Sequence, residues 1–526
     1  MSTSRRDFLR FVVAGSAAAG CPVDLKLLAA EGGMHGQANP SAGAGESAPS
    51  AEVDGDHFDI CHKVRDGGTF PKPAPSKKCE VVIVGGGVSG MSTAYFLRER
   101  DFFLIEKEPH WGGNAYREEY QGQGFATGSA FDTEGSHSAQ LAHELGLTLL
   151  PVKSADPTIA NGKWVYDTWG AGLDELPYSA AVRDSFKKFR ADMLAIDFEK
   201  NKEMYDAKTL ASITDAYAPE IRQWWDAFGP SNWGARAEDT SAYVGLSGFA
   251  EMTTLANDDI RVTLPGGNGA LAAALTKWLA AKYAERMVAD AAAVSVDTRK
   301  DGVHVTYMQG GQPLTVAAKY AVMATPKFFT ARIVAGLPEA QSDAMMQFRM
   351  CPYPVINMIF DRPVYNRAYD TWCPGNTFTD FIVADWVLQR QPGYRQKNNI
   401  LSFYTPLREA QRSQMLDVAG CRTIATHALA DFQKLLPEFR QAQPVEIHFY
   451  RRGHPMFLPA PGLYTKVIPL ANQPMDRVFF ANTDSVGPMS DISNAVLISS
   501  KAAEWVGQRA TGASAASATA AIALND

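Results

Sequence analysis

The sequence predicts an α/β protein in which two domains are interleaved along the chain. Residues 80–84 consist mostly of valine and isoleucine and lead into glycines, which is typical of a parallel strand buried on both faces. A helix pattern follows over 89–99 and a second strand over 102–105, so this region predicts one βαβ unit. The segment from about 155 to 259 is instead rich in helix formers, and strand-like runs return at 303–307. This alternation favours two domains, each assembled from separated pieces of chain.

Low-complexity segments bound the region expected to fold. Twelve of the fifteen residues from Gly36 to Ser50 are Gly, Ala, Ser or Pro, and residues 71–78 form a second loose stretch, so order should begin at Cys79. The expected organisation is a signal peptide at 1–30, a flexible linker at 31–78, a first domain formed by 79–150, 261–335 and 455–509, an α+β domain formed by 151–260 and 336–454, and a disordered tail at 510–526.

Composition excludes several classes of protein. The 526 residues carry a net charge of −7 and are 46% hydrophobic, which fits a large globular chain without a basic surface for nucleic acid. The six cysteines include no CxxC pair, so zinc ribbons, iron-sulfur clusters and covalent c-type haem lack their ligands. The ten histidines form no metal-ligand pattern. We therefore expect neither a bound metal nor a nucleic-acid partner.

The N-terminus resembles a twin-arginine export signal. The arginine pair at 5–6 is followed by Phe-Leu at 8–9 and by an apolar run over 11–20, half of the ~20 residues needed to cross a bilayer. Such signals export proteins already folded, usually around a cofactor. The resemblance therefore implies a tightly bound prosthetic group, the twin-arginine translocase as a partner and a periplasmic location. A soluble product cleaved after 28–30 is favoured over a lipoprotein anchored at Cys21, because the leucine expected three residues before Cys21 is missing.

A glycine-rich turn connects the first predicted strand to its helix. Gly85, Gly87 and Gly90 satisfy GxGxxG, in which the glycines make the turn, let a pyrophosphate approach the backbone and let the helix pack closely on the strand. The phosphate then lies at the helix N-terminus, which includes Ser89 and where free N–H groups favour an anion. Glu106 ends the second strand, where an acid accepts hydrogen bonds from ribose hydroxyls. Together these features predict a Rossmann-type dinucleotide site.

Four further stretches resemble the FAD-containing amine oxidoreductase superfamily, which includes amine and polyamine oxidases, phytoene-type desaturases and protoporphyrinogen oxidase. They are Trp-Gly-Gly-Asn-Ala at 111–115, the Pro-Gly-Gly stretch at 264–271, the strand end at 321–326 and the closing segment at 477–503. They follow the superfamily's order along the chain. The resemblance implies a Rossmann-type, GR2-like FAD-binding domain interleaved with an α+β substrate-binding domain.

The resemblance also implies roles for individual residues. Asn114 stands where an arginine is frequent, so the phosphate charge would be met by backbone amides and the helix dipole. Leu463 stands where covalently flavinylated members have cysteine, so FAD is expected to be non-covalent. The residues expected to hold its ADP half are Gly85, Gly87, Ser89, Gly90, Glu106, Gly112 and Gly113. Gly128 and Ser129 are expected beside the flavin, Asp484 at the ribityl and pyrophosphate region, and Ile492 at the pyrimidine edge.

Three residues are candidates for catalysis. Tyr464 lies in a Gly-x-Tyr stretch that resembles one aromatic wall of the amine oxidase site, but it could equally pack at a domain junction. Asp491 aligns near the second wall and could pair with a cationic substrate nitrogen or cap a helix. His454 could act as a base or shape the cavity, although loop histidines are more often structural.

Two other features bear on the reaction. No lysine occurs at 354–358, where many amine oxidases carry one that reaches the flavin through water, which favours a dehydrogenase that passes electrons to a periplasmic acceptor. A set of aromatic residues could line an apolar tunnel, but their helical spacing favours a plain core. These residues are Trp224, Trp225, Trp233, Tyr243 and Phe249.

The leading hypothesis is a periplasmic FAD-dependent oxidoreductase that moves a hydride from the carbon beside nitrogen of an amine or polyamine to flavin N5. One alternative is a desaturase or isomerase of an apolar polyene. Another is a flavoprotein without catalysis that carries electrons. A cavity lined only by apolar groups would favour the polyene, whereas carboxylates at its mouth would favour a polyamine.

Overall fold

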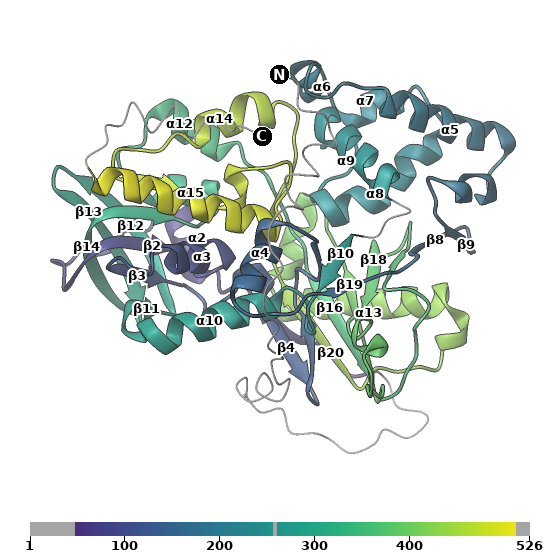
Figure 1. Cartoon of the computed structure of the whole chain (residues 1–526), viewed down its shortest axis with the longest axis horizontal. Coiled ribbons are helices and arrows are strands. Elements are labelled where there is room, and N and C mark those ends of the chain that lie inside the picture. Colours follow the sequence, from purple (N-terminus) through teal and green to yellow (C-terminus); the bar gives the residue numbers. More distant parts are fainter. Residues whose placement is uncertain (1–47, 256–259, 512–526) are drawn as a thin grey trace.

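The computed structural model describes residues 48–255 and 260–511 (Figure 1). Figure 1 shows two halves, one built on a sheet covered by α15 (Ile492–Ala510), α3 (Val88–Phe96) and α10 (Gly269–Tyr283), and one built on a second sheet below a group of helices. Both halves draw on segments far apart in sequence, as the colours show. The predicted interleaved α/β fold class is confirmed.

The nucleotide-binding half contains a seven-stranded sheet. Its strands are β11 (Met287–Val288), β3 (Phe102–Ile105), β2 (Lys77–Val84), β14 (Gln312–Met323), β13 (Gly302–Gln309) and β12 (Ala291–Arg299) in that order, with β22 (Val478–Phe480) on the end of β14. The pairs β11–β3, β3–β2, β2–β14 and β14–β22 are parallel. Alternate residues of β2 pack on opposite faces, Val81 and Ile83 towards the α3 side and Val82 and Val84 towards the other. Burial on both faces explains why the strand reads as an unbroken apolar run.

The second half contains an eight-stranded sheet. Its order is β1 (Glu52–Gly55), β20 (Glu446–Arg451), β16 (Val355–Phe360), β19 (Asn399–Tyr404), β18 (Asp380–Val383), β17 (Asp370–Trp372), β8 (Pro157–Ala160) and β9 (Lys163–Tyr166). One face packs on α13 (Val418–Leu435), where Ile356 and Phe403 meet Ile424 and Phe432. Because side chains alternate along a strand, the residues between these point to the opposite face.

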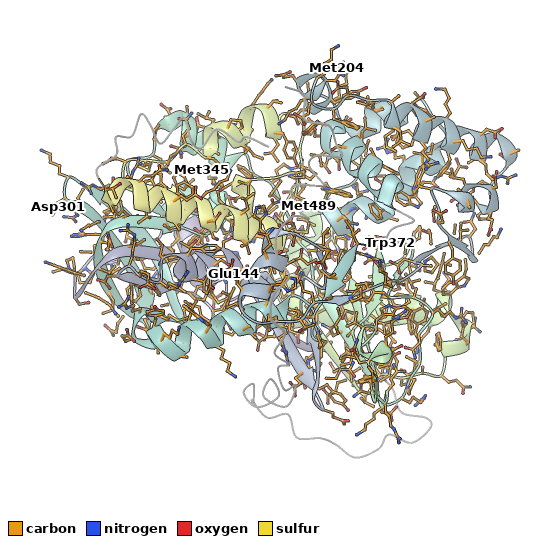
Figure 2. All side chains as sticks on the ribbon, viewed as in Figure 1. Glu144, Met204, Asp301, Met345, Trp372 and Met489 are labelled. Carbon is orange, nitrogen blue, oxygen red and sulfur yellow. The ribbon has the colours of Figure 1, made fainter. Side chains whose placement is uncertain are left out.

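A layer of helices lies beside this sheet. It consists of α5 (Ala180–Leu194), α6 (Lys202–Asp206), α7 (Leu210–Thr214), α8 (Pro219–Trp233) and α9 (Ala242–Leu255). Trp225 stacks on Trp233 with ring centres 5.3 Å apart, and Trp224 packs on Phe249 at 5.0 Å. Figure 2 labels Trp372 below these helices, where its ring lies 4.4 Å from that of Phe228. The aromatic set therefore forms a core, as its helical spacing predicted.

The prediction of a flexible linker at 31–78 is wrong for its second part, which contains a strand and a helix. Strand β1 pairs in parallel with β20, and α2 (Asp59–Arg65) packs against α11 (Lys327–Ile333) and β12. Strand β1 has only four residues, mostly polar, so it has no apolar pattern of its own. Main-chain pairing with residues about 400 positions away holds it in place, and sequence periodicity cannot reveal such a pairing. Residues 1–30, the first part of the linker and most of the tail at 510–526 lie outside the described residues. Among residues 48–255 and 260–511, no helix is long and apolar enough to cross a membrane.

Candidate functional site

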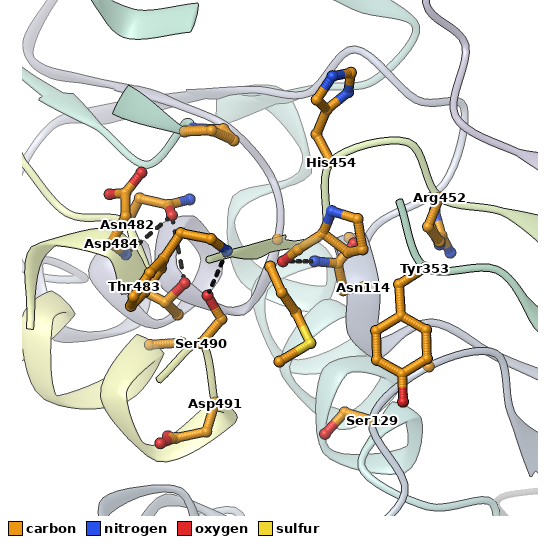
Figure 3. A pocket seen from close by; sticks show the side chains of 18 of the residues that line it. Asn114, Ser129, Tyr353, Arg452, His454, Asn482, Thr483, Asp484, Ser490 and Asp491 are labelled. Atoms are coloured by element: carbon orange, nitrogen blue, oxygen red, sulfur yellow. Dashed lines mark hydrogen bonds between the residues drawn. The ribbon is translucent and has the colours of Figure 1, made fainter. Parts of the chain in front are cut away.

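One large cavity lies between the two halves and is lined by both. Its volume of about 2650 Å³ exceeds the ~300–1,000 Å³ of an ordinary small-molecule pocket, so it has room for a dinucleotide and a second molecule. Ten of the eleven residues expected to hold the cofactor line it, which are Gly85, Gly87, Ser89, Glu106, Gly112, Gly113, Gly128, Ser129, Asp484 and Ile492. Figure 3 shows part of this cavity, with Asp484 on one side of the view and Ser129 on the other.

The backbone surroundings of the three glycines of the turn differ from one another, as the motif leads one to expect. Gly85 has φ +107°, and a Cβ there would lie 2.7 Å from the carbonyl oxygen of Ala324. A Cβ at Gly90 would overlap the carbonyl oxygen of Gly85, so this glycine lets α3 pack on the strand rather than lining the cavity. A Cβ at Gly87 would have the Cα of Gly113 as its nearest atom, at 3.8 Å, so there is open space beside Gly87, which lines the cavity. Gly87 is the N-cap of α3 and no side chain caps the helix, which leaves N–H groups for an anion.

Glu106 lies at the end of β3, where the sequence predicted a ribose ligand. Its carboxylate accepts hydrogen bonds from the backbone N–H of Gly86 and, at 2.7 Å, from that of Glu108. Burial raises the pKa of this carboxyl, although the nearby Lys107 acts in the opposite direction. A carboxylate held by two backbone donors has a fixed orientation and free lone pairs for hydroxyl donors. The glycine turn, the uncapped helix and Glu106 together fit a dinucleotide.

Asp484 is held by a lysine that sequence reasoning missed. Lys327 donates its backbone N–H to Asp484 Oδ2 at 2.7 Å and its ammonium to Oδ1 at 2.9 Å, and both side chains are 1% exposed. Burial lowers the pKa of Lys327, and the charge of Asp484 opposes that shift. Lys327 directly follows Pro326, the last residue of the strand-end stretch that resembles the superfamily, so its position was a usable signal.

Lys327→Met should destabilise the protein by about 3–5 kcal/mol, because it leaves the carboxylate of Asp484 buried without its partner. Chemical denaturation of the full-length variant measures this. Removing both charges in Lys327→Met/Asp484→Leu should recover much of the loss. If the single variant had the wild-type free energy of unfolding, the ion pair would not contribute this stability.

Tyr464 does not line the cavity. It lies in the short helical turn Leu463–Val467, its hydroxyl donates to the carbonyl oxygen of Pro488 at 2.7 Å, and its ring lies 5.9 Å from that of Tyr243. These contacts support the alternative in which Tyr464 packs at a domain junction.

Asp491 lines the cavity and caps a helix. It is the N-cap residue of α15, and its carboxylate accepts from the backbone N–H of Asn494 at 2.7 Å and from the Asn494 side-chain amide at 2.8 Å. Such a cap stabilises the helix through one of its unpaired N–H groups. The geometry therefore supports the capping role that the sequence left open, and Asp491 remains a substrate contact only as a hypothesis.

His454 lines the cavity on a different wall from Asp491 (Figure 3). Its ring lies 4.9 Å from that of Phe328. Burial, with the positive charge of Arg412 nearby, lowers the pKa of His454 to about 4. The imidazole is therefore neutral near pH 7 and is a weak base.

Two buried aspartates that the sequence did not single out face the cavity. Asp370 on β17 and Asp380 on β18 are 2% and 3% exposed, and both line the cavity. In the antiparallel pairing of these strands Asp380 lies opposite Trp372, which puts both carboxyls on the face turned away from α13. The hydroxyl of Thr379 donates to Asp380 at 2.6 Å, whereas Asp370 Oδ1 has no hydrogen-bond partner among the described residues.

The electrostatics of this acid pair are unusual. Burial, together with the charges of Asp380 and Asp156, raises the pKa of Asp370 well above its usual range, and the nearby charge of Arg261 only partly offsets this shift. Burial raises the pKa of Asp380 to about 7. A cation in the cavity would therefore stabilise the pair, because an opposite charge favours the ionised form of each carboxyl. Among the described residues no group of three or more ligating side chains could hold a metal ion.

Tyr404 connects the acid pair to the segment expected beside the flavin. It lies opposite Asp380 in the pairing of β18 with β19, and its hydroxyl donates to the carbonyl oxygen of Gly128 at 2.9 Å. The face with the two aspartates therefore adjoins the part of the dinucleotide site where Gly128 and Ser129 line the cavity.

The fold and this site define a class of protein with a Rossmann-like nucleotide-binding domain. Residues 83–145 match the family described as NAD(P)-binding Rossmann-like domain. Among solved structures, the chain shares its fold with wild-type putrescine oxidase bound to putrescine, at a TM-score of 0.64 and 16% identity over 82% of this chain and 99% of that one. The chain also shares this fold with cyclohexylamine oxidase from Brevibacterium oxydans IH-35A, at a TM-score of 0.65 and 17% identity over 82% of this chain and 99% of that one.

A curated relative is similar over a shorter stretch. Oxidoreductase PigB from Serratia sp. (strain ATCC 39006) is 26% identical over 286 residues, which are 51% of this chain and 41% of that protein. The match thus spans less than half of the relative's length.

Proposed function

We propose that this protein is an FAD-dependent oxidoreductase that oxidises an amine. The observation that carries the proposal is the pair of buried aspartates, Asp370 and Asp380, on a wall of the same cavity that holds the glycine turn. A polyene cannot stabilise such carboxyls, because it has no charge or hydrogen-bond donor to offset the cost of burying them. An ammonium group has a positive charge and hydrogen-bond donors.

The dinucleotide would lie along the glycine turn, with its ribose at Glu106 and its flavin beside Gly128 and Ser129. FAD, when bound, supplies the acceptor for a hydride. The chain's own residues bind and orient it. Leu463, at the position expected to be cysteine in covalently linked members, is buried and carries no reactive group, so the proposed attachment is non-covalent.

The substrate amine would enter as the ammonium and pair with the two aspartates. The carbon beside a nitrogen becomes a good hydride donor only when the nitrogen has lost its proton. Asp380, whose pKa is about 7, is suited to take that proton near neutral pH, which turns the ammonium into the free amine and the carboxylate into the acid. Loss of a hydride from the free amine then leaves an iminium ion, which water hydrolyses to a carbonyl compound and the released ammonium.

We propose an electron acceptor other than oxygen. Strand β16 has Asn357, not lysine, on the face turned away from α13, and its side-chain amide donates to the carbonyl oxygen of Ala126 at 3.1 Å. This contact fixes the asparagine in the sheet. Readmitting oxygen to the reduced protein distinguishes the two cases, since slow reoxidation supports a dehydrogenase.

The proposal includes export in the folded state by the twin-arginine translocase. Arg5→Lys/Arg6→Lys should leave the protein, with its FAD, in the cytoplasm of a bacterial host, as measured by cell fractionation and flavin absorbance. The matched control is Arg98→Lys, a half-buried residue of the described part of the chain that is not part of the twin-arginine motif. Periplasmic delivery at the wild-type level would contradict this route.

Anaerobic mixing of the holoprotein with panels of amines, polyamines, amino acids and polyenes tests the function, with flavin bleaching followed at about 450 nm. Bleaching by an amine supports the proposal. Bleaching by polyenes alone would favour a desaturase, and bleaching by none would favour an electron carrier.

A further inference from the structure

Arg452 is a buried cation in the cavity whose hydrogen bonds are incomplete. Its side chain is 4% exposed and lines the cavity just beyond the end of β20. Its nearest polar contacts are Asp56 Oδ1 at 3.6 Å and Thr127 Oγ1 at 3.4 Å, both longer than the ~2.7–2.9 Å of a charged hydrogen bond. Its Nε has no partner among the described residues. A buried charge in this state is costly unless an anion joins it.

The segment before the first Rossmann strand positions this arginine. Asp56 follows β1, and its carboxylate accepts from the backbone N–H of Gly453 at 2.8 Å. Burial alone would raise the pKa of Asp56, but the charges of Lys107 and Arg452 hold it below its usual value. Asp56 therefore stays ionised and keeps Arg452 beside the cavity without satisfying it.

Arg452 also lies beside the turn that lacks its expected arginine. Asn114 follows the second glycine pair, and its side-chain amide donates to the carbonyl oxygen of Pro455 at 3.0 Å, which ties the turn to the loop that carries Arg452. Thr127, the other contact of Arg452, donates its hydroxyl to the carbonyl oxygen of Tyr116 in the same turn. In Figure 3 Asn114 and Arg452 lie on one side of the view and Asp484 lies on the other.

We propose that Arg452, positioned by Asp56, binds the pyrophosphate of the dinucleotide and supplies the positive charge that Asn114 lacks. The inference rests on the proposed function only in taking FAD as the ligand. It assigns a cofactor role to a loop of the second half of the molecule and to the segment at 52–56, neither of which belongs to the Rossmann motif.

The test compares the affinity of full-length variants for FAD and for riboflavin, which has no phosphate. For Arg452→Met, FAD fluorescence released on serial dilution of the holoprotein should report about 10- to 100-fold weaker binding, while riboflavin binding to flavin-stripped protein should stay at the wild-type value. Asp56→Asn should show a smaller loss of the same kind. Arg367→Met, an exposed arginine paired with Glu438, is the control.

A second variant separates charge from folding. Arg452→Met/Asn114→Arg should regain FAD affinity, since it returns a cation to the turn. Unchanged FAD affinity of Arg452→Met, or an equal loss for FAD and riboflavin, would overturn the role of Arg452. Failure of the wild type to bind FAD would instead overturn the proposed function.

Discussion

Asp370→Asn and Asp380→Asn should each lower kcat/KM for amines by about 100-fold, because removing one carboxyl partner of a buried ammonium costs about 2–5 kcal/mol. Steady-state kinetics with the best amine of the panel measure the loss. In the wild type kcat/KM should rise as the pH passes through about 7, where Asp380 loses its proton and becomes able to accept one. This limb of the profile should disappear in Asp380→Asn.

The matched control is Asp361→Asn, an exposed aspartate of the same half that pairs with Arg362. Its kinetics should equal those of the wild type, and the flavin spectrum of all three variants should be unchanged, because neither acid belongs to the glycine turn. Wild-type kcat/KM in both acid variants would remove the pair from the mechanism.

Gly90→Ala should yield a protein that purifies without FAD. The new methyl group would overlap the carbonyl oxygen of Gly85, which is backbone and cannot rotate away, so the turn and α3 must separate. The cost should exceed the ~1–3 kcal/mol of ordinary overpacking. The flavin-to-protein absorbance ratio of the purified variant measures the effect.

Gly507→Ala provides the control within another helix of the same half. A Cβ at Gly507 meets nothing within 4 Å, so this change should keep FAD and raise helix stability slightly. If Gly90→Ala retained the wild-type amount of FAD, the close approach of helix and strand would not be needed for binding.

The nucleotide half of the site was predictable because its signals are local. Gly85, Gly87, Gly90 and Glu106 lie within one βαβ unit, and their roles follow from backbone geometry that any Rossmann turn requires. The buried strand was predictable for the same reason, since burial on both faces leaves an unbroken apolar run.

The substrate half was not predictable because its residues meet only through long-range pairing. Asp370 and Asp380 are brought to one face by the register of β17 with β18, and the sequence marks neither strand strongly. Arg452 and Asp56 are about 400 positions apart and meet only because β1 adds to the edge of the sheet. Tyr464 was singled out by resemblance, with packing at a domain junction as the alternative, and its contacts with Pro488 and Tyr243 support that alternative.

The central claim is that a hydride leaves the carbon beside an amine nitrogen. Anaerobic rapid mixing of the holoprotein with the best amine, deuterated at that carbon, tests it most directly, with the same amine deuterated at the next carbon as control. Flavin bleaching should be several-fold slower for the first compound and unchanged for the second. Equal rates for both compounds, in experiments where bleaching itself is rate-limiting, would contradict the claim.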